Sequence, residues 1–258
     1  TASLVGDLVV RGLGVTHTRQ PQLAEVHLSL GLVGKVAVAG LAFGLTSIAF
    51  SELTHGIKRL FAATIRWAPA RPVIGGIGIM VLAALVGTRD YLGLSIPLIT
   101  IATAGGAGII AGAFAWKLLF TALTLGTGFQ GGEVTPLFVI GATLGVTMGR
   151  LLDVPIPLMA AVGFVAVFAG AANTPLACTI MGVELFGSGA LVPFAVGCVV
   201  SYIFSSHRGI YGTQRIDAPK GTALLDGKDV ALTLNQVAQH RRQWLPAARR
   251  DPESHEST

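Results

Sequence analysis

The sequence predicts an all-α integral membrane protein, and three features of the 258-residue chain support this class. Apolar residues make up 52% of the chain and charged residues only 12%, whereas charged residues make up about a quarter of a typical soluble domain. The apolar runs are long and continuous rather than alternating, which favours helices over a membrane β-barrel. Glycine and proline interrupt several of these runs, a pattern typical of transporters built from discontinuous helices.

The N-terminal part contains the first full-length span. The chain opens partway through an apolar segment, residues 4–10, so we expect it to be a fragment. Residues 30–50 are long enough for the roughly 20 residues that a bilayer requires, and Lys35 near one end is expected to snorkel to the interface. Residues 51–71 are amphipathic and carry more basic than acidic side chains, which predicts a loop on the cytoplasmic side.

The middle of the chain alternates short apolar segments with breaks. Residues 72–86 predict a second apolar helix. Residues 92–115 are interrupted by Pro97 and by a glycine cluster, which predicts two short helices rather than one span. Residues 116–125 continue as a helix that contains Lys117, a side chain also expected to snorkel.

Four further helices are predicted after a glycine-rich loop at residues 126–132. Their expected ranges are 137–152, 156–172, 176–186 and 191–204. The second of them ends at Asn173-Thr174-Pro175, because proline breaks one helix and begins the next. Glu184 falls in the third of these helices, where we expect it to be buried and bonded to backbone or paired.

Small residues at a spacing of four predict close contacts between helices. This spacing occurs at Gly40/Gly44, at Gly108/Gly112 and at Gly141/Gly145/Gly149. The two cysteines, Cys178 and Cys198, fall inside apolar segments and are expected to be small buried residues, with neither a disulfide nor metal spacing.

Residues 213–258 form a polar, charged tail that we expect in the cytoplasm, after a transmembrane domain at residues 1–212. The net charge of +5 lies mostly in the loops and in this tail, as expected for the cytoplasmic flanks of membrane segments, so we expect no nucleic-acid partner. No cofactor or metal is expected either.

The candidate site is the glycine-rich loop and the helix that follows it. Glycines allow backbone N–H groups to converge, and a helix N-terminus adds positive potential, so Gly132 and the Val134 backbone N–H are predicted to bind an anion. Glu133 would carry a proton or organise water around the anion, or it would cap the helix. Thr135 would donate its hydroxyl to the anion or cap the helix backbone.

Four stretches of the chain resemble the second half of the CLC chloride channel and antiporter family. They are residues 126–136 with Gly141, 172–184, 201–206 and 210–211. The family pattern Gly-x-Phe-x-Pro is similar to residues 132–136 here, and Tyr211 matches the tyrosine that helps to coordinate the anion. The resemblance implies a bundle of tilted and discontinuous helices, comprising the second inverted repeat and the end of the first. It also implies a homodimer whose interface would include residues 176–204.

Two departures from the family pattern resemble its fluoride-exporting branch. Val134 replaces the usual phenylalanine, and Glu133 replaces an apolar residue. The resemblance therefore implies fluoride/proton antiport in the inner (plasma) membrane by a multi-pass protein, with a chloride channel or chloride/proton antiporter as the alternative. The strings that carry the selectivity loop and the gating glutamate of the first repeat are absent, so the gating glutamate is assigned to no residue of this chain.

Two rival interpretations come from other functional classes. A membrane enzyme is disfavoured because the sequence has no His-x-x-x-His pair, no nucleophile with a nearby base and no Walker-type loop. A non-transporting assembly subunit is the second rival, because a chain that lacks the first repeat could not form a complete pore alone.

Overall fold

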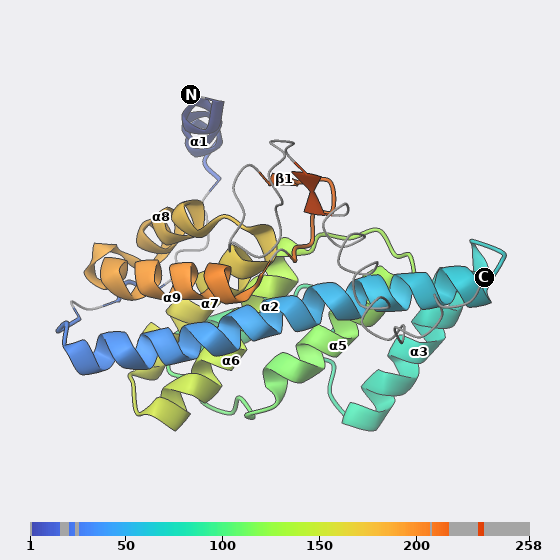
Figure 1. Cartoon of the computed structure of the whole chain (residues 1–258), viewed down its shortest axis with the longest axis horizontal. Coiled ribbons are helices and arrows are strands. Elements are labelled where there is room, and N and C mark those ends of the chain that lie inside the picture. The colour runs from blue at the N-terminus through green and yellow to red at the C-terminus, as the bar shows by residue number, and fades with distance from the viewer. Residues whose placement is uncertain (1, 16–20, 24–25, 207, 217–231, 235–258) are drawn as a thin grey trace, which may run out of the picture.

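The computed structural model describes residues 2–15, 21–23, 26–206, 208–216 and 232–234. Their regular secondary structure is helical, apart from one pair of two-residue strands (Figure 1). The elements are α1 (Ala2–Gly12), α2 (Leu30–Thr64), α3 (Ala70–Val86), α4 (Ile96–Thr103), α5 (Ala113–Gly126), α6 (Val134–Leu152), α7 (Ile156–Ala172), α8 (Pro175–Phe186), the 3-10 turn η1 (Ser188–Ala190), α9 (Leu191–Phe204), β1 (Arg215–Ile216) and β2 (Leu232–Thr233). The two strands pair antiparallel within the predicted tail, most of which lies outside the described residues.

The longest element, α2, differs from its prediction. It is one helix of 35 residues, so the expected loop after residue 50 does not exist before Ile65. No proline interrupts the sequence until Pro69, and Gly56, the one glycine between residues 45 and 64, is tolerated inside the helix. A helix of this length spans about 52 Å, which exceeds the roughly 30 Å hydrocarbon core of a bilayer. It runs across the whole bundle, and its basic C-terminal part reaches the neighbourhood of α3 (Figure 1).

The break between α4 and α5 confirms the prediction of two helices. The linker contains Gly105, Gly106 and Gly108 in left-handed conformations, with φ of 120°, 69° and 77°. The expected packing of a Gly108/Gly112 pair is therefore wrong, because these residues do not share a helix. The linker is instead tied to α6, whose Arg150 guanidinium donates to the carbonyl oxygens of Ile109 and Gly106 at 2.6 and 2.7 Å.

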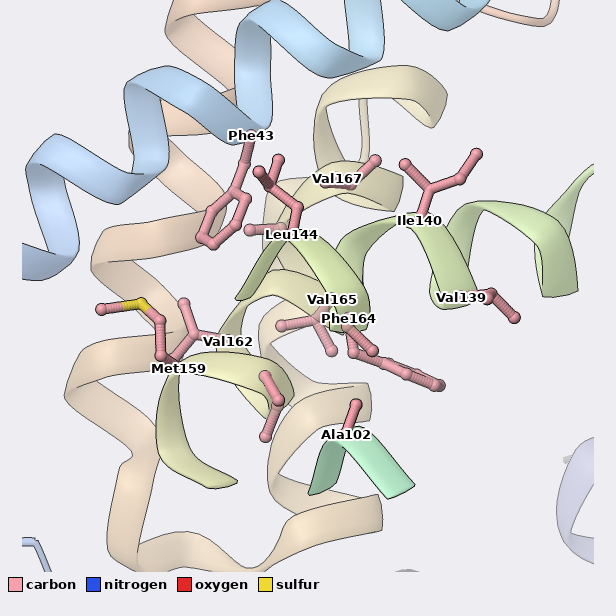
Figure 2. Packing of buried hydrophobic residues seen from close by; sticks show 14 of the residues in the cluster. Phe43, Ala102, Val139, Ile140, Leu144, Met159, Val162, Phe164, Val165 and Val167 are labelled. Carbon is pink, nitrogen blue, oxygen red and sulfur yellow. The ribbon is translucent and has the colours of Figure 1, made fainter. Parts of the chain in front are cut away.

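The closest helix contact joins α6 to α7. A Cβ added to Gly141 would run into the backbone of Gly163, and one added to Gly145 would run into the Met159 carbonyl. The predicted small-residue contact is therefore confirmed on α6. Figure 2 shows the side chains that surround this crossing, including Ile140 of α6.

Helix α7 forms the centre of the bundle. Fourteen of its 17 residues are buried, as expected for a helix that is apolar on all faces. It packs against α2, α4, α6, α8 and α9. A chain of aromatic rings links four of these helices, because Phe164 lies between Phe138 and Phe186, and Phe186 contacts Phe194.

Helices α2 and α9 lie side by side (Figure 1). A Cβ on Gly40 would lie 2.8 Å from the Val200 Cβ, and one on Gly44 would lie 2.8 Å from the Ser201 carbonyl oxygen. Both glycines therefore permit the close approach that their spacing predicted.

The outer surface remains apolar, as expected for a protein surrounded by lipid. Helix α3 exposes six large apolar side chains and buries only Gly75. Two helices of the described chain, α2 and α6, are both long and apolar enough to cross a membrane, and several shorter helices are equally apolar. Cys178 and Cys198 are buried free thiols that form no disulfide, as their apolar surroundings predicted.

The α6–α7 crossing gives a first testable expectation. Substituting Gly141→Ala should lower the free energy of unfolding by about 1–3 kcal/mol, because the added methyl group overlaps the backbone of Gly163. The measurement is thermal unfolding of the full-length protein in detergent. Gly56→Ala is the matched control, since a Cβ there meets nothing within 4 Å and should be neutral or stabilising. Equal melting temperatures for both variants would contradict the importance of this contact.

Candidate functional site at the start of α6

The first turn of α6 presents backbone N–H groups without acceptors. The helix begins at Val134, three residues earlier than predicted, and its first hydrogen bond runs from the Leu137 N–H to the Glu133 carbonyl at 3.2 Å. Within the described chain no acceptor is recorded for the amides of Val134 and Thr135, and Pro136 has no N–H. Two donors and the helix dipole therefore converge at this end of α6, which is the arrangement of an anion site.

The loop before α6 is held at one end and open at the other. A Cβ on Gly126 would meet the Ile57 side chain and lie 3.2 Å from the Thr54 carbonyl oxygen, so this glycine permits close contact with α2. Gly128 has a left-handed φ of 103°. A Cβ on Gly132 would meet nothing within 4 Å, so packing does not demand a glycine there and the space beside the helix start is open.

The Glu133 side chain is half-buried and makes no capping hydrogen bond, although Glu133 occupies the N-cap position. The capping alternative therefore lacks its hydrogen bond. His55 and Lys58 of α2 lie close enough to interact electrostatically with the carboxylate. The sequence showed these basic residues, but their position beside the loop could not be predicted while they were assigned to a separate loop.

Val134 and Thr135 are half-buried on the first turn. The described chain shows no hydrogen bond from the Thr135 hydroxyl, so its capping alternative gains no support. The next two residues, Pro136 and Leu137, are buried, so the first turn of α6 passes from half-buried polar groups to the interior of the bundle.

Tyr211 lies in a separate segment after α9, with 44% of its surface exposed. The Ile210 N–H donates to the Ala171 carbonyl at 3.0 Å and anchors this segment to the end of α7. Among the described residues, no recorded hydrogen bond or ring contact joins Tyr211 to residues 132–135. The four predicted residues 132–135 are consecutive at the start of α6, whereas Tyr211 belongs to this separate segment.

Helix α2 links the two parts of the predicted site. Arg208, three residues before Tyr211, forms an ion pair with Glu52 at 3.1 Å. His55, which is within electrostatic range of Glu133, lies about one helical turn further along α2. The neighbouring His207 lies outside the described residues. Glu52 and His55 are thus neighbours of the site that sequence reasoning missed.

Lys117 corrects the expectation that it snorkels. Its side chain is buried, and its Nζ donates to the carbonyls of Tyr91 and Gly93 at 3.1 and 2.6 Å and to the Ser95 hydroxyl at 2.8 Å. Lysine can reach water only if its stem points to an interface, whereas α5 directs this one at the turn before α4. Lys117, Gly131 and Gly132 line the same cavity of about 200 Å³.

Two other ionisable side chains can be compared with their predictions. Glu184 is exposed on α8, so the expectation of a buried acid is wrong; the short helix turns this position outward. Lys35 is half-buried, and its Nζ donates to the Asp153 carbonyl at 3.0 Å, which fixes the first turns of α2 to the end of α6.

The family model described as the voltage gated chloride channel matches residues 1–206. The chain belongs to this CLC family. Its predicted fold class, an all-α membrane-embedded bundle of CLC type, is confirmed by this match and by a solved structure. That structure, of a CLC-type fluoride/proton antiporter, superimposes with a TM-score of 0.74 at 34% sequence identity, over 78% of this chain and 51% of its own.

Two curated relatives extend the comparison. A chloride/fluoride channel protein of Pseudomonas syringae pv. tomato is 42% identical over 225 residues, covering 85% of this chain and 49% of the relative. The voltage-gated ClC-type chloride channel ClcB of Salmonella typhi is 26% identical over 204 residues, covering 73% of this chain and 49% of the relative. The chain spans about half the length of these CLC relatives.

The buried lysine of this CLC chain gives a second expectation. Substituting Lys117→Met should lower the free energy of unfolding by about 2 kcal/mol, because three acceptors lose their shared donor. Thermal unfolding and amide hydrogen exchange at residues 91–95 of the full-length protein measure the effect. Arg66→Met removes an exposed cation and is the control. Unchanged exchange at residues 91–95 would show that Lys117 does not hold this turn.

Proposed function

We propose that the full-length protein exports fluoride in exchange for protons. The observation that carries the proposal is the sequence Gly132-Glu133-Val134-Thr135-Pro136 at a helix N-terminus whose first N–H groups lack acceptors within the described chain. Two related proteins support it by their descriptions, one as a chloride/fluoride channel protein and one as a fluoride/proton antiporter.

The polar character of the first turn favours fluoride over chloride. Fluoride is small and holds its hydration water tightly, so a protein site must replace that water with several polar groups. The amides of Val134 and Thr135 and the Thr135 hydroxyl supply donors, and the branched Val134 side chain occupies less space than the phenylalanine of the family pattern. An anion held here would also benefit from the positive end of the α6 dipole.

Glu133 is the proposed proton carrier. A carboxylate beside an anion site would repel the anion when it is ionised but not when it is protonated. Proton binding to Glu133 and anion binding to the site would therefore favour each other. The basic groups of His55 and Lys58 lie within electrostatic range of the carboxylate and limit the cost of its ionised form. Tyr211 would complete the anion site through its hydroxyl in the full-length protein.

The proposed assembly is a homodimer of multi-pass subunits in the inner (plasma) membrane. Helices α8 and α9 expose large apolar side chains, among them Leu176, Ile180 and Ile203, on the surface where the dimer contact is proposed. The basic residues near the end of α2 favour a cytoplasmic position for that end. Transport rather than catalysis is the proposed activity.

The decisive experiment reconstitutes the full-length protein in liposomes and measures fluoride efflux, chloride efflux and proton uptake under an imposed pH gradient. Fluoride efflux that drives proton uptake, and that exceeds chloride efflux, supports the proposal. Equal or greater chloride efflux would instead support the alternative, a chloride channel or chloride/proton antiporter.

Glu133→Gln provides a third expectation. The variant should reduce proton uptake per fluoride by about tenfold or more, equivalent to about 1.4 kcal/mol, because an amide cannot carry the proton. The same liposome assay measures it. Glu184→Gln removes an exposed carboxylate of α8 and should leave the coupling unchanged. Wild-type transport and coupling in the Glu133 variant would remove this residue from the proton route.

The variant Tyr211→Phe provides a fourth testable expectation. Losing one hydroxyl donor should weaken fluoride binding by about three- to tenfold, the effect of a single hydrogen bond. The concentration of fluoride that gives half-maximal efflux measures the change. Tyr202→Phe, on α9, deletes the same group outside the proposed site. Equal fluoride affinities for the Tyr211 variant and the wild type would exclude its hydroxyl as a ligand.

A further inference from the structure

A row of buried hydroxyl groups lies between α2 and α9. Ser47, Ser51 and Thr54 are spaced by four and three residues and therefore share one face of α2. Ser201 lies on α9, which packs against α2, and Ser205 follows four residues later as the C-cap of this helix. All five side chains are at least nine-tenths buried. We call this set the hydroxyl seam.

Three groups of the seam lack partners. The Ser51 Oγ, Thr54 Oγ1 and Ser201 Oγ atoms have no hydrogen-bond partner within the described chain. Ser47 differs, because its Oγ donates to the Val167 carbonyl at 2.7 Å, and Ser205 donates to the Tyr202 carbonyl at 2.9 Å. Buried hydroxyls are almost always bonded to protein or to ordered water, so three unpartnered ones in one seam indicate bound water.

A glycine of α7 lets two hydroxyls of the seam approach each other closely. A Cβ added to Gly170 would lie 2.7 Å from both the Ser47 Oγ and the Ser201 Oγ. The two hydroxyls therefore converge from different helices over a position that carries no side chain. A stripe of small residues would pack closely without such unpartnered groups, so close packing of α2 against α9 does not by itself explain the seam.

One end of the seam lies beside both parts of the proposed site. At this end, the Thr54 carbonyl oxygen lies against Gly126, which begins the glycine-rich loop, and the next residue, His55, interacts with Glu133. At this same end, α9 leads into the segment that carries Tyr211, and the Glu52–Arg208 ion pair joins that segment to α2. The other end of the seam, at Ser47 and Ser201, lies inside the bundle against Gly170. The charged groups beside the seam are the Glu52–Arg208 ion pair, His55 and Lys58.

We propose that the hydroxyl seam holds a file of ordered water molecules and conducts protons between the neighbourhood of Glu133 and the interior of the bundle. A hydroxyl both donates and accepts, so each transfer breaks one O–H bond as it forms another on the next oxygen, and no group is altered overall. The hydration of the seam stands on the geometry alone. Its proton-conducting role rests on the proposed function.

The first experiment tests hydration without any transport. Ser51→Cys and Thr54→Cys are introduced separately into full-length protein that lacks Cys178 and Cys198, and each is exposed to Ag⁺, an ion close to water in size, in chloride-free nitrate buffer. Unreacted thiols are then counted with a maleimide after denaturation. We expect Ag⁺ to abolish most labelling at both positions.

Thr143→Cys is the matched control, because Thr143 is equally buried but its hydroxyl donates to the Val139 and Ile140 carbonyls. Its thiol should remain available to the maleimide. Retained labelling at positions 51 and 54, equal to that at 143, would mean that the seam is dry and would overturn the proposal.

The second experiment separates the seam from the proposed function. In liposomes, the double variant Ser51→Ala/Ser201→Ala should keep fluoride efflux and lose proton uptake, whereas Thr143→Val should keep both. A hydrated seam with unchanged proton uptake in the double variant would overturn the conducting role. Wild-type protein that moves fluoride without protons would refute the proposed function instead, and the silver result would still decide whether the seam is hydrated.

Discussion

The close crossing of α6 and α7 is the constraint on which the rest of the structure depends. Gly141 and Gly145 allow the two backbones to approach until no side chain fits between them. Because α7 is buried among five other helices, this contact fixes α6 relative to the whole bundle. The N-terminus of α6, with its unpaired N–H groups, is therefore held at a defined place. A site that depends on backbone dipoles requires such rigidity, since the dipoles cannot adjust independently of the helix.

Helix α2 organises the polar part of the molecule in the same way that α7 organises the apolar part. Its 35 residues form one rigid rod that contacts the loop before α6, the end of α9 and the segment that carries Tyr211. Glu52 and His55 connect to opposite parts of the proposed site from adjacent turns of this rod. A single continuous helix can hold the loop before α6 and the Tyr211 segment at fixed positions relative to each other. The separate span and loop expected from the sequence could not do so.

Polar groups inside the bundle are satisfied mainly by backbone. Thr46, Thr121 and Thr143 donate to carbonyls one turn earlier in their own helices, and Lys117 uses three acceptors of a turn. In an apolar environment these bonds replace water that is absent. The unpartnered hydroxyls between α2 and α9 stand out against this pattern, and so do the free amides at the start of α6. Both departures lie next to the segments proposed to handle protons and anions.

The sequence alone determined the membrane class, the limits of α7 and α9, the break before α5 and the loop that carries Glu133, because hydropathy, proline and glycine act locally. The tertiary structure decided what depends on distant partners. The continuity of α2, the burial of Lys117 and the exposure of Glu184 follow from which neighbour each helix face meets. For the same reason, only the folded chain could show that His55 is within electrostatic range of Glu133 and that Gly108 belongs to a turn.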